Sequence, residues 1–234
     1  MTIIDRGSLK LSQARSADNL ILIDKPAAWS SFDVVKKIRY LTGIKKVGHA
    51  GTLDPFATGL LILGTGKKTK QLAQISHAAK EYRAVLVLGK STSTYDVTGE
   101  VTDEQTNFEV TDEQIDTVLS SFRGEIEQVP PMFSAKKVNG KRLYKLARQG
   151  KEVERKPQTI TIFDLKKIQR QGAHIEFLVR CSKGTYIRAL AHDIGKKLGC
   201  GAYLNELERT AIDDFYISDA LSIDAFEKLW KRLN

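Results

Sequence analysis

Apolar residues recur along this chain with two different spacings, and each spacing predicts one type of element. Compact apolar runs bounded by turn residues predict strands over residues 19–24, 81–88, 159–165 and 174–181. Apolar residues repeated every three or four positions predict three helices. The first is capped by Ser31, the second begins with a capping box at residues 111–114, and the third follows a turn at residues 182–184. Gly43 and Gly199 are placed to end the first and last of these helices.

The order of these elements predicts the fold class. Strands outnumber helices, and several strands follow one another with no helix between them. Neighbouring parallel strands need a long crossover, usually a helix, whereas antiparallel strands need only a turn. We therefore expect an α+β fold with a mixed, largely antiparallel central sheet flanked by helices.

The length and composition indicate one large globular domain. At about 150 residues per domain, 234 residues correspond to one domain with an appendage. Residues 1–18 are polar and lack the apolar core of a signal peptide, so we expect a flexible lead-in before a main domain at residues 19–234. The absence of an apolar run of 18 residues argues against a membrane span. Cys181 and Cys200 form neither a zinc-ligand set nor a disulfide framework, which favours the cytoplasm.

The formal net charge of +9 is concentrated in residues 123–156, which contain ten basic and four acidic residues. A basic surface favours a polyanionic partner, because binding releases the counterions of the polyanion. Cations near Phe133 and Tyr144 are typical of an insertion that grips RNA; they are Lys136, Lys137, Lys141, Arg142, Lys145 and Arg148. A solvated basic helix preceded by an ordinary loop explains the composition equally well.

A glycine-rich segment, residues 47–70, contains the candidate chemistry. Its five glycines favour tight turns or a close approach of the backbone to a ligand, but their spacing does not match a phosphate-binding P-loop. Within it, Asp54 is followed by a proline and preceded, five positions earlier, by His49. From these residues alone, a turn capped by the aspartate and a structural histidine are the simpler interpretations. The other three histidines are not spaced as metal ligands beside it.

The sequence GHAGTLDPFATGLL, residues 48–61, resembles the signature of the bacterial TruB-type tRNA pseudouridine(55) synthases and matches each of its fixed positions. Similar segments span most of the chain: LIDKP at 22–26, KEYRA at 80–84, TSTYDVTG at 92–99, the basic segment 122–150, and CSKGTYIRALAHDIGKKLGCGA at 181–202. The resemblance implies the pseudouridine synthase fold and an isomerase acting on the T-loop uridine of tRNA. Such an enzyme cleaves the N1–C1′ bond, turns the base and rejoins it through C5, with no cofactor and no metal.

The resemblance also implies roles for the residues of the catalytic site. Asp54 would be the carboxylate nucleophile. Arg188 would keep Asp54 ionised and oriented through bidentate hydrogen bonding. Tyr82 would stack on the flipped uracil and is a candidate to carry a proton, while Tyr186 would line the same pocket. Without the resemblance, both tyrosines would be interpreted as ordinary packing residues.

Further residues are assigned to the RNA by the same resemblance. A base inside a folded loop cannot be attacked, so the enzyme must extrude the uridine, and His49 would occupy the space that it leaves. Lys25 resembles a buried basic residue that supports the site, and Leu207 lies where the family has a leucine that contacts the substrate. The insertion at 123–156 resembles the loop with which stand-alone enzymes hold the T arm, and we expect a monomer.

The chain departs from the family pattern in three places. Family members commonly continue into a C-terminal RNA-binding PUA domain, which we do not expect here. Glu208 stands where the family often has arginine, which predicts weaker RNA binding at that point. The triplet at residues 92–94 is Thr-Ser-Thr in place of Thr-Asp-Thr, while Asp96 is retained.

Two other functions fit parts of the same sequence. A guide-RNA-dependent synthase would share the aspartate motif but depend on partner proteins, and it would not need the basic insertion. A tRNA-binding or tRNA-folding chaperone would use the same basic surface. The set of Asp54, Tyr82 and Arg188 favours an enzyme, because a pure binder gains nothing from a carboxylate that faces an RNA backbone.

Overall fold

The computed structural model of the chain describes residues 3–6, 17–134, 136–138 and 140–233. The chain forms two compact units: unit 1 is Met1–Tyr82 with Leu207–Asn234, and unit 2 is Arg83–Glu206. The strands β5 (Lys80–Leu88) and β13 (Ala202–Ile212) contribute residues to both units. Among the described residues, no helix is long and apolar enough to cross a membrane.

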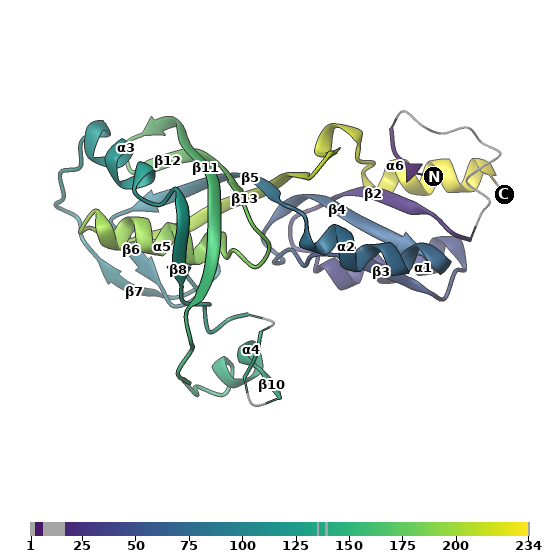
Figure 1. Cartoon of the computed structure of the whole chain (residues 1–234), viewed down its shortest axis with the longest axis horizontal. Coiled ribbons are helices and arrows are strands. Elements are labelled where there is room, and N and C mark those ends of the chain that lie inside the picture. Colours follow the sequence, from purple (N-terminus) through teal and green to yellow (C-terminus); the bar gives the residue numbers. More distant parts are fainter. Residues whose placement is uncertain (1–2, 7–16, 135, 139, 234) are drawn as a thin grey trace. The chain divides into compact units, whose positions relative to one another are not determined.

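Unit 1 is a small sheet with helices on both faces (Figure 1). Its other elements are β1 (Ile3–Ile4), β2 (Leu20–Lys25), α1 (Ser31–Thr42), β3 (Val47–Ala50), β4 (Thr58–Thr65), the 3-10 helix η1 (Gly66–Gln71), α2 (Leu72–His77), β14 (Phe215–Tyr216), the 3-10 helix η2 (Ile217–Asp219) and α6 (Ile223–Leu233). The strands pair in the order β1-β2-β4-β13, with β3 on β4 and β14 on β13. β4 runs antiparallel to β2 and β3 and parallel to β13.

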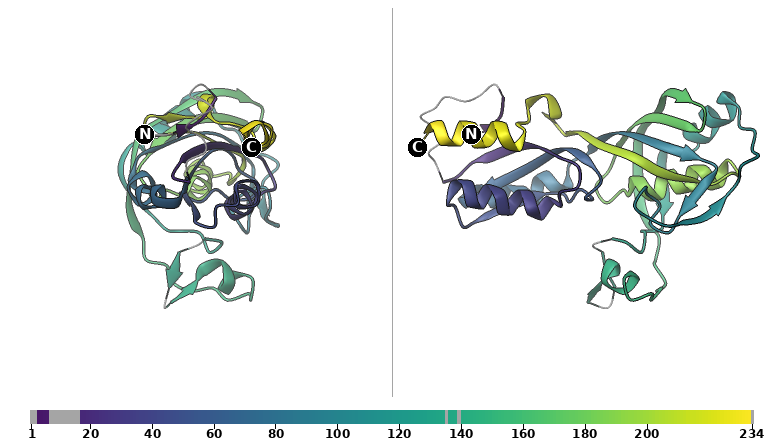
Figure 2. Two further views of the ribbon diagram at one scale, coloured as in Figure 1. Left: turned by 90° about the vertical axis from the view of Figure 1, so that its right-hand side faces the viewer. Right: turned by 180° about the vertical axis from the view of Figure 1, so that it is seen from behind.

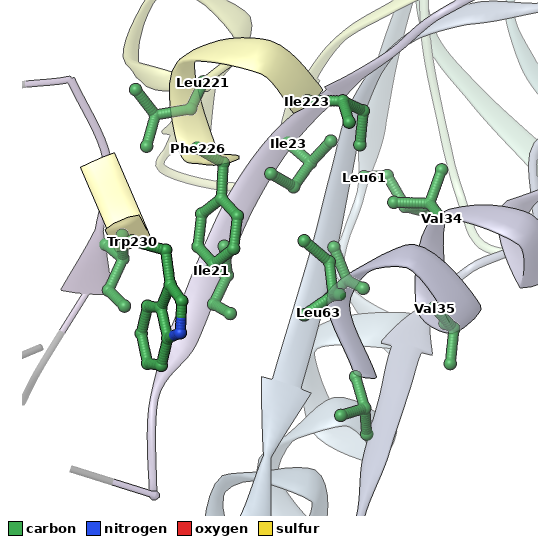
Figure 3. Close-up of a cluster of buried hydrophobic side chains, with 13 residues drawn as sticks. Ile21, Ile23, Val34, Val35, Leu61, Leu63, Leu221, Ile223, Phe226 and Trp230 are labelled. Carbon is green, nitrogen blue, oxygen red and sulfur yellow. The ribbon is translucent and has the colours of Figure 1, made fainter. Parts of the chain in front are cut away.

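The core of unit 1 lies on both faces of β2 and β4, because successive strand residues point to opposite sides. On one face, apolar residues pack against α1 and α6 (Figure 3); they include Ile21, Ile23, Leu61, Leu63, Phe226 and Trp230. On the other face, the alternate residues pack against α2; they include Leu20, Leu22, Leu60, Ile62 and Leu72. In the end-on view of Figure 2, yellow α6 and dark purple α1 accordingly lie on the same side of these strands.

Unit 2 is built on the continuing strands β5 and β13. Its other elements are β6 (Lys90–Thr92), β7 (Val101–Glu104), α3 (Asp112–Ser120), β8 (Gly124–Gln128), β9 (Lys137–Val138), β10 (Lys141–Arg142), α4 (Leu143–Ala147), β11 (Gln158–Gln171), β12 (His174–Cys181) and α5 (Ile187–Lys197). The strand order is β13-β5-β12-β11-β8, and β11 is antiparallel to both of its neighbours. The segment with β9, β10 and α4 leaves this sheet between β8 and β11 (Figure 1).

The α+β class and the mixed, largely antiparallel sheet are confirmed. The capping box at residues 111–114 begins α3, and Gly43 ends α1 in the left-handed conformation with φ of 70°. The prediction that Ser31 caps α1 is wrong, because the cap is Ser30, whose hydroxyl accepts a hydrogen bond from the Asp33 amide. The hydroxyl of Ser31 is thereby left to make a different contact, described below.

Two predicted boundaries also differ from the structure. The lead-in at 1–18 contains β1, which pairs with β2 and buries Ile4, while residues 1–2 and 7–16 lie outside the described residues. The first part of the segment 123–156 is the strand β8, which pairs with β11. We therefore use "insertion" below for residues 129–157, between the ends of these two strands.

Candidate active site

Asp54 lies in the loop between β3 and β4, next to a backbone segment that is held from both sides. The buried Ser31 hydroxyl accepts a hydrogen bond from the Leu53 amide (2.9 Å) and donates to the Leu53 carbonyl (3.2 Å). On the other side, the Ala57 amide donates to the Asp54 carbonyl at 3.2 Å, which closes a turn. Asp54 is half-buried, and the hydrogen bonds on both sides of it constrain the backbone that positions its side chain.

Lys25 lies against this turn and has no exposed surface. Its ammonium donates hydrogen bonds to the carbonyls of Pro26 (2.9 Å), Trp29 (2.6 Å) and Pro55 (3.3 Å). Burial lowers the pKa of Lys25 to about 8, and the negative charge of Asp54 acts in the opposite direction. Because this attraction is mutual, the Lys25 ammonium favours the ionised form of Asp54.

Arg209 is a site residue that the sequence analysis missed. Arg209 is 1% exposed, and its guanidinium donates to the carbonyls of Leu60 (2.8 Å) and Gly51 (3.2 Å). Arg209 also makes a side-chain hydrogen bond with the buried Tyr82, which opposes the lowering of the pKa of Arg209 by burial. Residues 207, 209 and 211 of β13 are all buried, so strand alternation could have indicated that Arg209 faces inward.

His49 and Leu207 lie in the same unit as Asp54. His49 is half-buried in β3, where burial and the positive charge of Arg209 lower the pKa of the imidazole. It is therefore neutral at pH 7, which suits a side chain that would take the place of an uncharged base. Leu207 is buried at the point where β13 enters unit 1, and Glu208 beside it is half-buried.

Arg188 lies in the first turn of α5 in unit 2 and is 4% exposed. Its Nη1 atom is 3.2 Å from Asp96 Oδ2 and donates to the Thr94 carbonyl at 3.0 Å, while Nη2 donates to the Phe133 carbonyl at 2.8 Å. The other Asp96 oxygen accepts hydrogen bonds from Thr94 Oγ1 and from the amide and hydroxyl of Thr98. The retained Asp96 thus orients Arg188, a role that the sequence analysis did not assign.

Tyr186 immediately precedes α5, and its backbone is held by Gln128. The Tyr186 amide donates to Gln128 Oε1 at 2.8 Å, and Gln128 Nε2 donates to the Tyr186 carbonyl at 3.1 Å. Gln128 is 1% exposed. Nothing in the local sequence around Gln128 signals this contact, because the two residues are 58 positions apart in the chain.

Two family models match consecutive parts of the chain. The model described as "TruB family pseudouridylate synthase (N terminal domain)" matches residues 39–187, and the model described as "tRNA pseudouridylate synthase B C-terminal domain" matches residues 188–233. The chain belongs to the TruB family of pseudouridylate synthases. It is therefore a member of an enzyme family, as the resemblance implies.

Curated relatives and solved structures support this membership of the TruB family. The tRNA pseudouridine synthase B of Geotalea uraniireducens is 49% identical over 207 residues, which are 88% of this chain and 67% of that protein. The protein of the same name from Chlamydia trachomatis is 46% identical over 207 residues, which are 88% of this chain and 85% of that protein. A structure titled "Crystal Structure of a Cbf5-Nop10-Gar1 Complex" matches with a TM-score of 0.72 and 27% identity, over 97% of this chain and 60% of that chain.

The structure assembles the predicted TruB site residues in two groups. Lys25, His49, Asp54, Tyr82 and Leu207 belong to unit 1, whereas Tyr186 and Arg188 belong to unit 2. The pairing of Asp54 with Arg188 stays a prediction. Among the described residues, no group of three or more His, Cys, Asp or Glu side chains is arranged to hold a metal ion.

The insertion presents cations of the kind that the TruB resemblance implies. Lys141, Lys145 and Arg148 are exposed, and the Arg148 guanidinium lies 5.7 Å from the centre of the Tyr144 ring. Lys136 instead donates to Gln158 Oε1 at 3.0 Å. The side chains of Lys137 and Arg142 lie outside the described part of the structure.

Proposed function

We propose that this chain converts the T-loop uridine of tRNA into pseudouridine, with Asp54 as the nucleophile. The main support for the proposal is the well-constrained loop around Asp54. In this loop Ser31 forms a hydrogen bond with the Leu53 amide, and Lys25 donates a hydrogen bond to the Pro55 carbonyl. Tight positioning of a reacting group lowers the entropy cost of reaching the transition state. The names of the relatives, tRNA pseudouridine synthase B, support tRNA as the substrate.

The reaction is an isomerisation whose atoms balance without a further reactant. The C1′–N1 bond breaks, a C1′–C5 bond forms, one proton leaves C5 and one proton is bound by N1. The ionised Asp54 acts as the nucleophile by attack at C1′ or by addition at C6, or it helps to form an elimination intermediate. The nearby Lys25 ammonium favours this ionised form.

Tyr82 is the group that we assign to the flipped base and to proton transfer. Its hydrogen bond with the buried Arg209 orients the phenol. His49 takes the place of the extruded uridine, Leu207 contacts the substrate, and Tyr186 lines the pocket of the flipped base. Arg188, oriented by Asp96, pairs with Asp54 and aligns its carboxylate.

The insertion binds the T arm of the substrate. Its exposed cations, Lys141, Lys145 and Arg148, suit phosphate contacts, which supply affinity rather than base specificity. We propose that the protein acts in the cytoplasm as a monomer and without a guide RNA. The relatives at 46–49% identity are named tRNA pseudouridine synthase B, which supports a stand-alone tRNA enzyme over a guide-dependent synthase or a chaperone.

The proposal is tested with purified protein and an unmodified tRNA transcript, without any other protein or cofactor. Chemical mapping of pseudouridine should find one modified position, the T-loop uridine, in both the full transcript and an isolated T-arm hairpin. Modification at another position, or only when a guide RNA is added, would contradict the proposal.

A further inference from the structure

Two glutamines face each other at the base of the insertion. Gln128 is the last residue of β8, Gln158 is the first residue of β11, and the two are Cα partners in the antiparallel register of these strands. The 29-residue insertion, residues 129–157, therefore leaves and re-enters the sheet at this pair.

Both glutamines bind the same short loop before α5. Gln128 makes the two hydrogen bonds to the Tyr186 backbone, and Gln158 Nε2 donates to the Gly184 carbonyl at 2.8 Å. Gln158 Oε1 also accepts the hydrogen bond from Lys136 of the insertion. The loop at residues 184–186 is thus attached to both ends of the insertion.

This attachment bears directly on the residues assigned to catalysis in unit 2. Tyr186 is the N-cap residue of α5, and its side chain does not cap the helix. Its carbonyl also accepts the first helical hydrogen bond, from the Leu190 amide at 3.0 Å. Gln128 therefore sets the position of the first turn of α5, which contains Arg188. A second link exists because Arg188 Nη2 donates to the Phe133 carbonyl within the insertion.

We propose that Gln128 is a positioning residue for the reaction, which acts through the Tyr186 backbone. Together with Gln158, Gln128 attaches the insertion to the loop at residues 184–186, which contains Tyr186 and directly precedes α5, the helix of Arg188. When the insertion binds RNA, the first turn of α5 is therefore already in position for the reaction. The inference rests on the proposed function. It predicts that loss of the Gln128 side chain lowers the rate of pseudouridine formation in the enzyme–tRNA complex and leaves the affinity for RNA nearly unchanged.

The chemistry of an amide makes the proposal testable with a near-isosteric variant. Gln128 both donates to and accepts from one peptide unit, and at neutral pH a glutamate can only accept. Protonation of the carboxyl restores a donor. The rate of Gln128→Glu, relative to wild type, should therefore rise as the pH falls from 7.5 to 5.5.

The experiment measures two quantities separately for wild type, Gln128→Ala and Gln128→Glu: the single-turnover rate constant at a saturating excess of enzyme over tRNA, and the Kd for tRNA. We expect Gln128→Ala to lower the rate constant at least tenfold and to change the Kd less than threefold. Gln171→Ala, which removes an exposed glutamine at the far end of β11, is the matched control and should behave as wild type.

The outcomes separate this inference from the proposed function. An inactive wild type would overturn the proposed function. An active wild type with a Gln128→Ala rate constant within twofold of the Gln171→Ala control would overturn the inference alone, as would a loss confined to the Kd. If Gln128→Ala does not fold, as judged by circular dichroism, the glutamate variant decides, and a relative rate independent of pH would overturn the inference.

Discussion

At the scale of single residues, Lys25 combines a buried ammonium with three backbone carbonyl partners beside Asp54. A buried charge costs free energy unless it is compensated, and here the compensation comes from the carbonyls and from Asp54. The remaining cost appears as a pKa that is lowered to about 8. The same residue that favours an ionised Asp54 therefore makes the stability of unit 1 depend on pH.

We predict that wild type gains stability relative to Lys25→Met as the pH rises from 8 to 10. In this window native Lys25 has lost its proton, whereas unfolded Lys25, with its ordinary pKa of 10.5, retains it. The unfolded state then binds more protons, so the free energy of unfolding rises with pH, by up to about 3 kcal/mol at ~1.4 kcal/mol for each pKa unit. Urea unfolding of both proteins at pH 7.5 and 10 measures the difference, and a difference independent of pH would contradict the prediction.

At the scale of elements, the parallel pairing of β4 with β13 explains a glycine of the signature. Gly59 is the Cα partner of Arg209, and its φ is +97°. A Cβ atom at this position would lie 2.5 Å from the Arg209 carbonyl oxygen and 2.7 Å from the Arg209 amide nitrogen. Gly59 therefore permits the close strand contact that brings Arg209 to Leu60, Gly51 and Tyr82.

We predict that Gly59→Ala destabilises the protein more than Gly124→Ala. Both glycines have a positive φ, +97° and +95°, so both variants incur backbone strain of roughly 1–3 kcal/mol. A Cβ atom at Gly124 meets no atom within 4 Å, whereas at Gly59 it meets backbone and adds overpacking of about 1–3 kcal/mol. Urea unfolding followed by circular dichroism compares them. Equal losses of stability in the two variants would show that the close approach of the Arg209 backbone to residue 59 does not exclude a Cβ atom there.

The elements that the sequence predicts well are those whose signals are local. The apolar stripe of α1, the capping box of α3 and the apolar run of β2 each lie within a few residues of the structure that they specify. Long-range contacts are not visible in this way. Arg209 contacts Gly51 across 158 positions of the chain. The sequence predicts Ser31 as a helix cap because its contact with Leu53, 22 positions away, has no local signal.

At the scale of the whole molecule, the residues assigned to the reaction come from both units. The roles of Asp54, Tyr82 and Arg188 could be inferred from the TruB motifs, since no local pattern distinguishes a nucleophilic aspartate from a turn aspartate. The structure adds the residues that hold them: Ser31 and Lys25 for the Asp54 loop, Arg209 for Tyr82, and Asp96 for Arg188. Substitutions of these supporting residues can therefore test the roles that the motifs imply.

The most direct test of Asp54 as the nucleophile replaces it by asparagine, which keeps the size of the side chain but removes the carboxylate. Wild type and Asp54→Asn are incubated with an unmodified tRNA transcript, and pseudouridine at the T-loop uridine and the Kd for tRNA are measured on the same preparations. We predict no detectable pseudouridine with Asp54→Asn and a Kd within threefold of wild type. Pseudouridine formed by Asp54→Asn at a rate near that of wild type would contradict it.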